Sequence, residues 1–385
     1  MKKNFTYWTF YVYAALTMFV SIYSFKKAEY NWDMLPYMAI ILHHDGNNDI
    51  QKIHSEVYTT AKQSITETDF SKLTDSNFEY RRSVFTSAAA FSQQLPFYVV
   101  KPLYTRLSYL FYKCGVSLPK TTVLPSAISY FLISLIVYSW IGKYLSQMPA
   151  FIFSTLLMLS PFMLAGAKLS TPDMFSSLLL IAGIYSYVEY RKQILSASFL
   201  LLAIFARFDN IIPVVLISLM VFYIEKTKEG LSAWKYISFV AAIIASYIFI
   251  SQQANQFGWS IFYYPDFASH LNPYYDINKP FSFSGYLSLV KSQLMSGLYY
   301  SSLLIFVFLG YMLIRFSRVN GEKNISPDIS FPIAFLATII IRFVLQPIIA
   351  DRFYTAYYLV ISIFVLKKYA LLYPGTSKYP IKTQL

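Results

Sequence analysis

Four aspartates lie where an apolar stretch of the chain meets a polar one: Asp33, Asp173, Asp209 and Asp351. A carboxylate at the edge of a hydrophobic span costs free energy unless it is paired or hydrated, so four of them indicate a polar site. Two arginines accompany them, Arg207 in Ala206-Arg207-Phe208-Asp209 and Arg352 directly after Asp351. A carboxylate in such a site can act as a general base, and a guanidinium can bind a phosphate with two parallel hydrogen bonds.

Each of these residues also has a purely structural interpretation. Asp33 precedes Leu35-Pro36, and Asp173 follows Thr171-Pro172, so both fit a helix N-cap whose carboxylate accepts backbone N–H bonds. As a general base, Asp33 would have its pKa raised toward neutrality by burial. Arg207 and Asp209 could form an internal ion pair, whereas Arg352, like Arg342 before it, could extend to the membrane interface.

Basic residues recur in the polar segment that follows the first apolar run. Arg81, Arg82 and Lys101 lie in or near amphipathic stretches, where they could bind an anionic lipid headgroup either specifically or nonspecifically. The histidines of this segment lack partners at metal-ligand spacing, so we expect no histidine metal site. The single cysteine excludes an intramolecular disulfide.

The composition identifies a membrane protein. The chain has 385 residues, of which 56% are hydrophobic and only 13% charged, and a soluble protein of this size needs more surface charge. The net charge of +13 does not indicate nucleic-acid binding here, because lysines and arginines of cytoplasmic loops account for much of it. We therefore expect contact with membrane lipids and none with nucleic acid.

Hydropathy predicts an all-α integral membrane fold of about ten transmembrane helices forming one domain over residues 1–385. The stretch 194–224 is too long for one helix, and splitting it into a hairpin at Arg207–Asn210 leaves most loop lysines and arginines on one side, as cytoplasmic loops require. The predicted spans are 5–25, 120–141, 149–167, 173–189, 194–207, 210–224, 235–252, 291–314, 329–345 and 353–371.

This topology places all four boundary aspartates on the outer face, together with two long segments. In the first, residues 26–119, we expect helices over Asp33–Leu42 and Ser83–Cys114 to lie along the membrane surface, joined by a mobile polar loop near Asp45–Tyr80. The second, residues 253–290, is rich in Tyr, Pro and Asn, which suggests an ordered loop over a cavity. We read residues 5–25 as an uncleaved signal anchor and the basic tail 374–385 as loose.

The order of these features resembles the GT-C superfamily of membrane glycosyltransferases, in particular its mannosyl- and aminoarabinose-transferase branches. The resemblance spans most of the chain and is carried by the following motifs in sequence order: Trp32-Asp33, Leu95-Pro96-Phe97-Tyr98, Lys101-Pro102-Leu103-Tyr104, Ser170-Thr171-Pro172-Asp173, Ala206-Arg207-Phe208-Asp209 and Asp351-Arg352-Phe353-Tyr354.

The resemblance implies an inverting transfer of sugar from a polyprenyl-phosphate donor to a glycan, lipid or protein acceptor, on the outer side of a bacterial plasma membrane. It implies Asp33 as the base, and Lys101 with Arg81 or Arg82 as ligands of the donor phosphate. Further substrate contacts would come from Asp173, Arg207, Asp209, Asp351 and Arg352. No cofactor is required, although a divalent cation is left open. A flippase or transporter for lipid-linked oligosaccharide, a glycan polymerase or ligase, and an inactive scaffold subunit are the alternatives.

Overall fold

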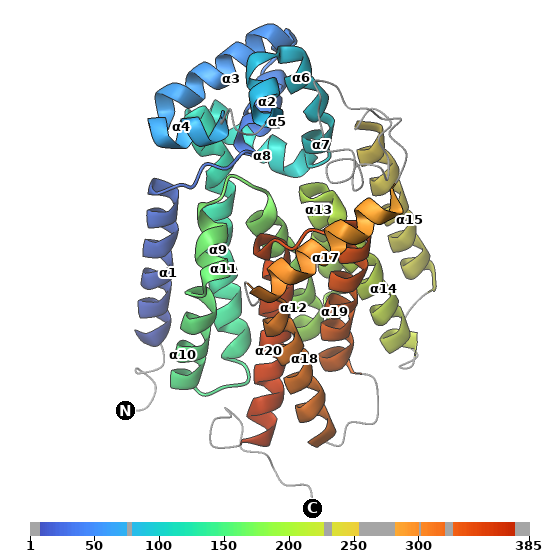
Figure 1. Cartoon of the computed structure of the whole chain (residues 1–385). Coiled ribbons are helices and arrows are strands. Elements are labelled where there is room, and N and C mark those ends of the chain that lie inside the picture. Colours follow the sequence, from blue (N-terminus) through green and yellow to red (C-terminus); the bar gives the residue numbers. More distant parts are fainter. Residues whose placement is uncertain are drawn as a thin grey trace, which may run out of the picture.

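In the computed structural model the described residues are 8–74, 79–226, 233–253, 282–299, 302–319 and 326–373. Every regular element in these ranges is a helix, and one isolated bridge joins Glu29 to Leu169. The chain forms a bundle of roughly parallel and antiparallel helices with a group of shorter helices across one end (Figure 1). We call that group the cap and the opposite end of the bundle the far end. The predicted all-α fold is confirmed.

Six helices of the described residues are long and apolar enough to cross a membrane, which makes this a membrane protein by length and composition. Two of them include a short 3-10 turn at the start, η2 (Phe208–Asn210) before α14 and η3 (Asp351–Tyr354) before α20. The six are α1 (Trp8–Lys26), α9 (Leu118–Ile141), α14 (Ile211–Lys226), α15 (Ala233–Gln253), α19 (Pro327–Leu345) and α20 (Thr355–Leu372).

The remaining predicted spans have a more varied structure. The range 149–167 is two helices, α10 (Gln147–Met158) and α11 (Pro161–Lys168), bent by 56° where Pro161 interrupts the backbone hydrogen bonds. The range 194–224 contains two helices, α13 (Gln193–Ala206) and α14, so the predicted helix break at Arg207–Asn210 is confirmed, although α13 is shorter than a membrane span.

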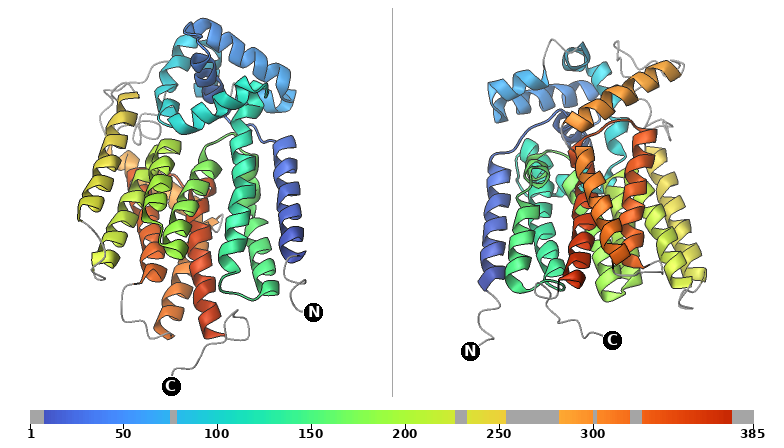
Figure 2. Two further views of the ribbon diagram at one scale, coloured as in Figure 1. Left: turned by 180° about the vertical axis from the view of Figure 1, so that it is seen from behind. Right: turned by 60° about the horizontal axis from the view of Figure 1, so that its bottom comes forward.

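One predicted span is wrong. The range 291–314 falls on two helices, α17 (Phe283–Tyr299) and α18 (Ser302–Val319). Helix α17 runs obliquely across the cap end of the bundle, whereas α18 runs along it (Figures 1 and 2). Most of the predicted second outer loop, 253–290, and the tail 374–385 lie outside the described residues.

Helix α12 (Asp173–Tyr190) is the central support of the site and packs most extensively against α13 and α9. Gly183 permits the close approach to α13, because a Cβ atom there would lie 3.0 Å from the Leu200 side chain. The core around it extends into α20, where a run from Leu359 to Phe364 is largely buried. Helices α12 and α20 both begin on the side of the bundle that faces the cap (Figure 1).

The cap has its own hydrophobic core, separate from that of the bundle. Residues Met34 to Leu42 are all buried, so the predicted helix at Asp33–Leu42 exists but does not lie along a membrane surface. The predicted mobile loop at Asp45–Tyr80 is also wrong, since α3 and α4 occupy most of its described part. The cap consists of α2 (Met34–His44), α3 (Ile50–Ser64), α4 (Glu67–Leu73), α5 (Glu79–Thr86), α6 (Ala88–Gln94), α7 (Pro96–Val99) and α8 (Pro102–Lys113).

Candidate functional site

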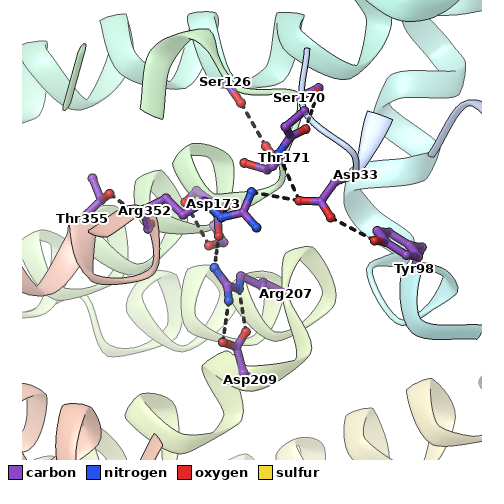
Figure 3. Close-up of polar contacts among 12 residues, drawn as sticks. Asp33, Tyr98, Ser126, Ser170, Thr171, Asp173, Arg207, Asp209, Arg352 and Thr355 are labelled. Atoms are coloured by element: carbon purple, nitrogen blue, oxygen red, sulfur yellow. Dashed lines mark hydrogen bonds and ion pairs between the residues drawn. The ribbon is translucent and has the colours of Figure 1, made fainter. Parts of the chain in front are cut away.

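Two connecting segments are tied together where the cap meets the bundle. The Glu29 N–H donates to the carbonyl of Lys168 at 3.0 Å, within the parallel bridge between Glu29 and Leu169. The Ser170 hydroxyl then donates to the side-chain oxygen of Asn31 at 2.5 Å. These bonds place the segment that leads into α2 beside the segment that leads into α12, so the aspartates at the two helix starts become neighbours (Figure 3).

Asp33 occupies the N-cap position of α2, yet its carboxylate makes no capping hydrogen bond. It accepts instead from the Tyr98 hydroxyl at 2.9 Å, from the Arg352 guanidinium at 2.8 Å and from the Asn31 amide at 3.1 Å. Arg352 comes from η3 at the other end of the sequence (Figure 3). The N-cap interpretation of Asp33 is therefore wrong, because the side chain is directed at residues of other elements.

Asp173 likewise does not cap its helix. It is the first residue of α12, it is buried, and its carboxylate binds the guanidinium of Arg207. Its other oxygen lies 3.7 Å from Nε of Arg352. Asp173 thus links the arginine that holds Asp33 to the arginine at the tip of the α13–α14 hairpin.

The hairpin tip extends this pattern into the bundle. Arg207 binds Asp209 through two hydrogen bonds, at 2.7 and 2.8 Å, which is the predicted internal ion pair. Arg342 on α19 is only 3% exposed and donates to Asp209 at 2.9 Å. We call the alternating series Arg342, Asp209, Arg207, Asp173, Arg352 and Asp33 the arginine–aspartate chain.

Phe353 lies among the three guanidinium groups of this chain. Its ring centre is 3.9 Å from the guanidinium carbon of Arg342, 4.3 Å from that of Arg207 and 5.2 Å from that of Arg352. Planar guanidinium groups stack favourably on aromatic faces, so the ring helps to hold three like charges close together.

A cavity of about 320 Å³ lies against the arginine–aspartate chain, between the cap and the bundle. The bundle supplies most of the charged lining and the cap most of the aromatic lining. The residues include Asp33, Tyr37, Tyr80, Gln94, Phe97, Tyr98, Lys101, Thr171, Asp173, Arg207, Phe208, Asp209, Arg352 and Phe353. Acid–base groups, cations and flat aromatic surfaces thus converge on one space, an arrangement typical of ligand sites.

Lys101 is the cation of this lining that is not bonded to a carboxylate. Its ammonium donates to the carbonyl of Phe97 at 2.8 Å and lies over the rings of Tyr98 and Tyr37, at 4.7 and 5.6 Å. Among the described residues, no carboxylate lies within ion-pair distance of it. Burial lowers the pKa of Lys101 to about 8, against the opposing effect of Asp33. Its charge is available to an anionic ligand near neutral pH.

The electrostatic environment of Asp33 corrects one expectation. Burial alone would raise the pKa of the carboxyl, but the positive charges of Arg352 and Lys101 outweigh that effect. Together with the hydrogen bond from Tyr98, they hold the pKa of Asp33 below its usual value. The predicted rise toward neutrality is therefore wrong, and Asp33 stays ionised at neutral pH. The Tyr98 hydroxyl has its pKa raised well above the usual value, mainly by burial, and so remains a donor.

Three predicted site residues lie away from this cavity. Arg81 binds the carbonyl of Lys72 at 2.6 Å, Arg82 is exposed, and neither lines the cavity. Asp351 begins η3 but does not line the cavity either, although the adjacent Arg352 does. Three of the four boundary aspartates, Asp33, Asp173 and Asp209, lie together at the cavity. Of the residues predicted to contact the donor phosphate, Lys101 lines the cavity, whereas Arg81 and Arg82 do not.

Sequence reasoning did not assign roles to Tyr98, Phe353 or Gln94. Tyr98 and Phe353 lie inside motifs that were noted for their order, whereas no sequence signal marks Gln94. In the described part of the chain, no three His, Cys, Asp or Glu side chains are grouped so as to hold a metal ion. Comparisons with protein-family models, with curated proteins and with solved structures gave no match for this chain.

Proposed function

We propose that the protein is a membrane glycosyltransferase that moves a sugar from a polyprenyl-phosphate donor to a glycan, lipid or protein acceptor. The observation that carries the proposal is one cavity that holds both an ionised carboxylate, Asp33, and a cation without a carboxylate partner, Lys101. An inverting transfer needs a base for the acceptor hydroxyl and positive charge for the departing phosphate. The GT-C-like order of motifs is consistent with this assignment.

Asp33 has the hydrogen-bonding capacity that a base requires. A carboxylate has about four lone-pair sites, and the donors Tyr98, Arg352 and Asn31 use three of them. One site remains for the acceptor hydroxyl. As the acceptor oxygen bonds to the anomeric carbon, the bond from that carbon to the phosphate oxygen breaks and the hydroxyl proton passes to Asp33. A carboxylate of low pKa suffices, because the hydroxyl becomes strongly acidic as the new bond forms.

Lys101 provides the charge for the leaving group. The other lining cations, Arg207 and Arg352, are already bound to aspartates, so an arriving phosphate would meet the ammonium of Lys101 first. The phosphate leaves with the electron pair of the broken bond, and a fixed cation beside it stabilises that charge in the transition state. The polyprenyl chain would remain in the surrounding bilayer.

The proposal places the cap outside a bacterial plasma membrane. Helices α10 and α13 begin, and α12, α14 and α20 end, toward the far end of the bundle (Figure 1). Lysines and arginines lie in or next to these helix ends in the sequence. Cytoplasmic segments carry such an excess in membrane proteins. The basic residues at these helix ends are Lys143, Arg191, Lys192, Lys226, Lys367 and Lys368.

The test compares Asp33→Asn with wild type by profiling surface glycans in the native host, with matched amounts of protein in the membrane. We expect Asp33→Asn to lose the modification, since general-base catalysis contributes about 10²–10⁴-fold. Asp351→Asn is the matched control, because this aspartate is at the cap end but outside the cavity.

A modification that persists in Asp33→Asn but disappears on deletion of the gene would contradict Asp33 as the base. Loss of polymer length with intact sugar transfer would instead identify a polymerase or ligase. Accumulation of lipid-linked sugar on the cytoplasmic side would identify a transporter.

A further inference from the structure

Two buried polar atoms of the cavity lining have no hydrogen-bond partner within the described part of the chain. They are the side-chain nitrogen Nε2 of Gln94 and the hydroxyl of Thr171. Gln94 is fully buried at the end of α6. An amide that gives up its hydration without gaining a partner destabilises the fold, so an unused N–H group beside a cavity indicates a ligand atom that would accept from it.

The neighbours of Gln94 determine which end of its amide is free. The Tyr80 hydroxyl donates to Oε1 of Gln94 at 2.9 Å. The Trp32 ring packs against the Tyr80 ring, with the two centroids 5.3 Å apart. Because the carbonyl oxygen of Gln94 accepts the Tyr80 proton, the NH₂ end of the amide is left with two donors and no acceptor within the described part of the chain.

Gln94 and Lys101 belong to the same wall of the cavity. Gln94 ends α6, Lys101 directly precedes α8, and the short helix α7 between them contributes Phe97 and Tyr98 to the same lining. In a polyprenyl-phosphate donor the sugar is attached directly to the phosphate. A donor whose phosphate contacts Lys101 would therefore carry its sugar along the wall that contains Gln94.

We propose that Gln94 is a specificity-determining residue, whose amide NH₂ donates to a hydroxyl or carbonyl oxygen on the sugar of the donor. The inference rests on the proposed function and adds the recognition of the sugar to it. Gln94 would donate a hydrogen bond to a neutral oxygen of the sugar, whereas Lys101 would bind the negatively charged phosphate. Sugars that carry an oxygen at the facing position are bound, and deoxy sugars lacking it are rejected, because the amide would remain unsatisfied.

The experiment measures binding of three lipids to purified protein in nanodiscs. The probes are undecaprenyl phosphate, which has no sugar, and the same lipid carrying glucose or N-acetylglucosamine. Gln94→Met removes the donor at nearly constant size. We expect it to weaken binding of at least one sugar-bearing lipid about tenfold, the scale of one lost hydrogen bond in a dry site. Binding of undecaprenyl phosphate should not change, which also shows that the variant is folded.

Two further variants separate recognition from packing. Tyr80→Phe keeps the amide but removes the bond that orients it, so we expect a smaller loss for the same lipid. Tyr58→Phe is the control, since the Tyr58 hydroxyl is also buried and unpartnered in the cap but is not in the cavity lining. It should bind all three lipids like wild type.

The outcomes distinguish the two proposals. Equal binding of every lipid by Gln94→Met and wild type overturns the role of Gln94 and leaves the transferase proposal standing. An equal loss for all three lipids assigns Gln94 a structural role and also overturns the inference. Failure of the wild-type protein to bind any of the lipids overturns the proposed function and the inference with it.

Discussion

Helices α12 and α19 each carry charged side chains near both of their ends. The charged group at the cap end lies beside the cavity, and the charged group at the far end does not. Helix α12 begins with Asp173 in the arginine–aspartate chain and carries Glu189 near its other end, about 24 Å away at 1.5 Å per residue. At that end Glu189 binds Lys143 at 3.2 Å and Trp140 at 2.9 Å. Asp328 binds Lys367 at 2.6 Å and lies 3.7 Å from Lys368. We call Lys143, Glu189, Asp328, Lys367 and Lys368 the far-end cluster.

Every lysine of the far-end cluster faces a carboxylate, even Lys368, which is fully buried. None of these side chains lines the cavity of about 320 Å³, whereas Lys101 lines it and has no carboxylate partner among the residues that the structure describes. Ion pairs at helix ends therefore do not identify a functional site by themselves. What distinguishes the cap end is a cavity beside a cation with no carboxylate partner among the described residues, because a ligand bound there would supply the missing charge.

The largest expected effect is on stability, and it should be the same at both ends. Asp209→Asn leaves Arg342 buried without a carboxylate partner, which should cost about 3–5 kcal/mol in the free energy of unfolding. Thermal unfolding in detergent measures it, with Asp328→Asn as the equivalent change at the far end. The double variant Asp209→Asn/Arg342→Met should recover much of the loss. No recovery would contradict the pairing of these two residues.

The next effect should separate the two ends. Lys101→Ala should weaken binding of undecaprenyl phosphate about tenfold or more, the scale of one charge-assisted hydrogen bond, with little change in Tm. Lys368→Ala should lower Tm and leave lipid binding unchanged, because Lys368 is buried near Asp328 and does not line the cavity. Affinity and Tm measured on the same nanodisc samples test both. Equal loss of lipid affinity in the two variants would remove the distinction between the clusters.

The pH dependence of activity tests whether the charge of Lys101 acts on the donor. The pKa of Lys101 is about 8, so its charge is lost as the pH rises above that value. We therefore expect kcat/KM for the donor, which reports the free enzyme, to fall above about pH 8. Lys101→Arg retains its charge at these pH values and should flatten the decline. An identical alkaline fall in this variant would assign the titration to another group. No acidic limb is expected near neutrality, because the pKa of Asp33 is lowered.

The smallest effect concerns Phe353. Phe353→Leu removes the aromatic face among three guanidinium groups but leaves every ion pair in place. We expect a loss of about 0.5–2 kcal/mol in unfolding free energy, the range of cation–π contacts. Phe335→Leu, a buried ring that is not among arginines, controls for lost packing. A greater loss in the control would show that the arginines do not depend on the ring.

The sequence predicted the parts of the fold that depend on local composition. The all-α membrane fold and the helix break at Arg207–Asn210 follow from hydropathy and loop charge, and both are confirmed. The bend at Pro161 was missed because the stretch is apolar throughout, and hydropathy contains no information about the direction of a helix axis. The division of 291–314 between α17 and α18 was missed for the same reason.

The candidate site depended on contacts between distant parts of the chain. Asp33 and Arg352 are at opposite ends of the sequence, and nothing local indicates that they meet. The pKa of Asp33 was predicted with the wrong sign, because burial was visible in the pattern and the neighbouring cations were not. Helix α2 was predicted to lie along the membrane surface but is buried in the core of the cap, since an apolar helix has the same composition in a protein core and at a bilayer.

The bridge between Glu29 and Leu169 has a consequence for any natural relative of this chain. Asp33 and Asp173 each follow their bridge residue by four positions. The two segments between the bridge and the aspartates, which we call the spacers, are therefore equal in length, and together they set the position of each carboxylate relative to the bridge. Insertions and deletions should therefore be rare in both spacers. An alignment of natural relatives can be examined for the absence of gaps in these two segments before any activity is assayed.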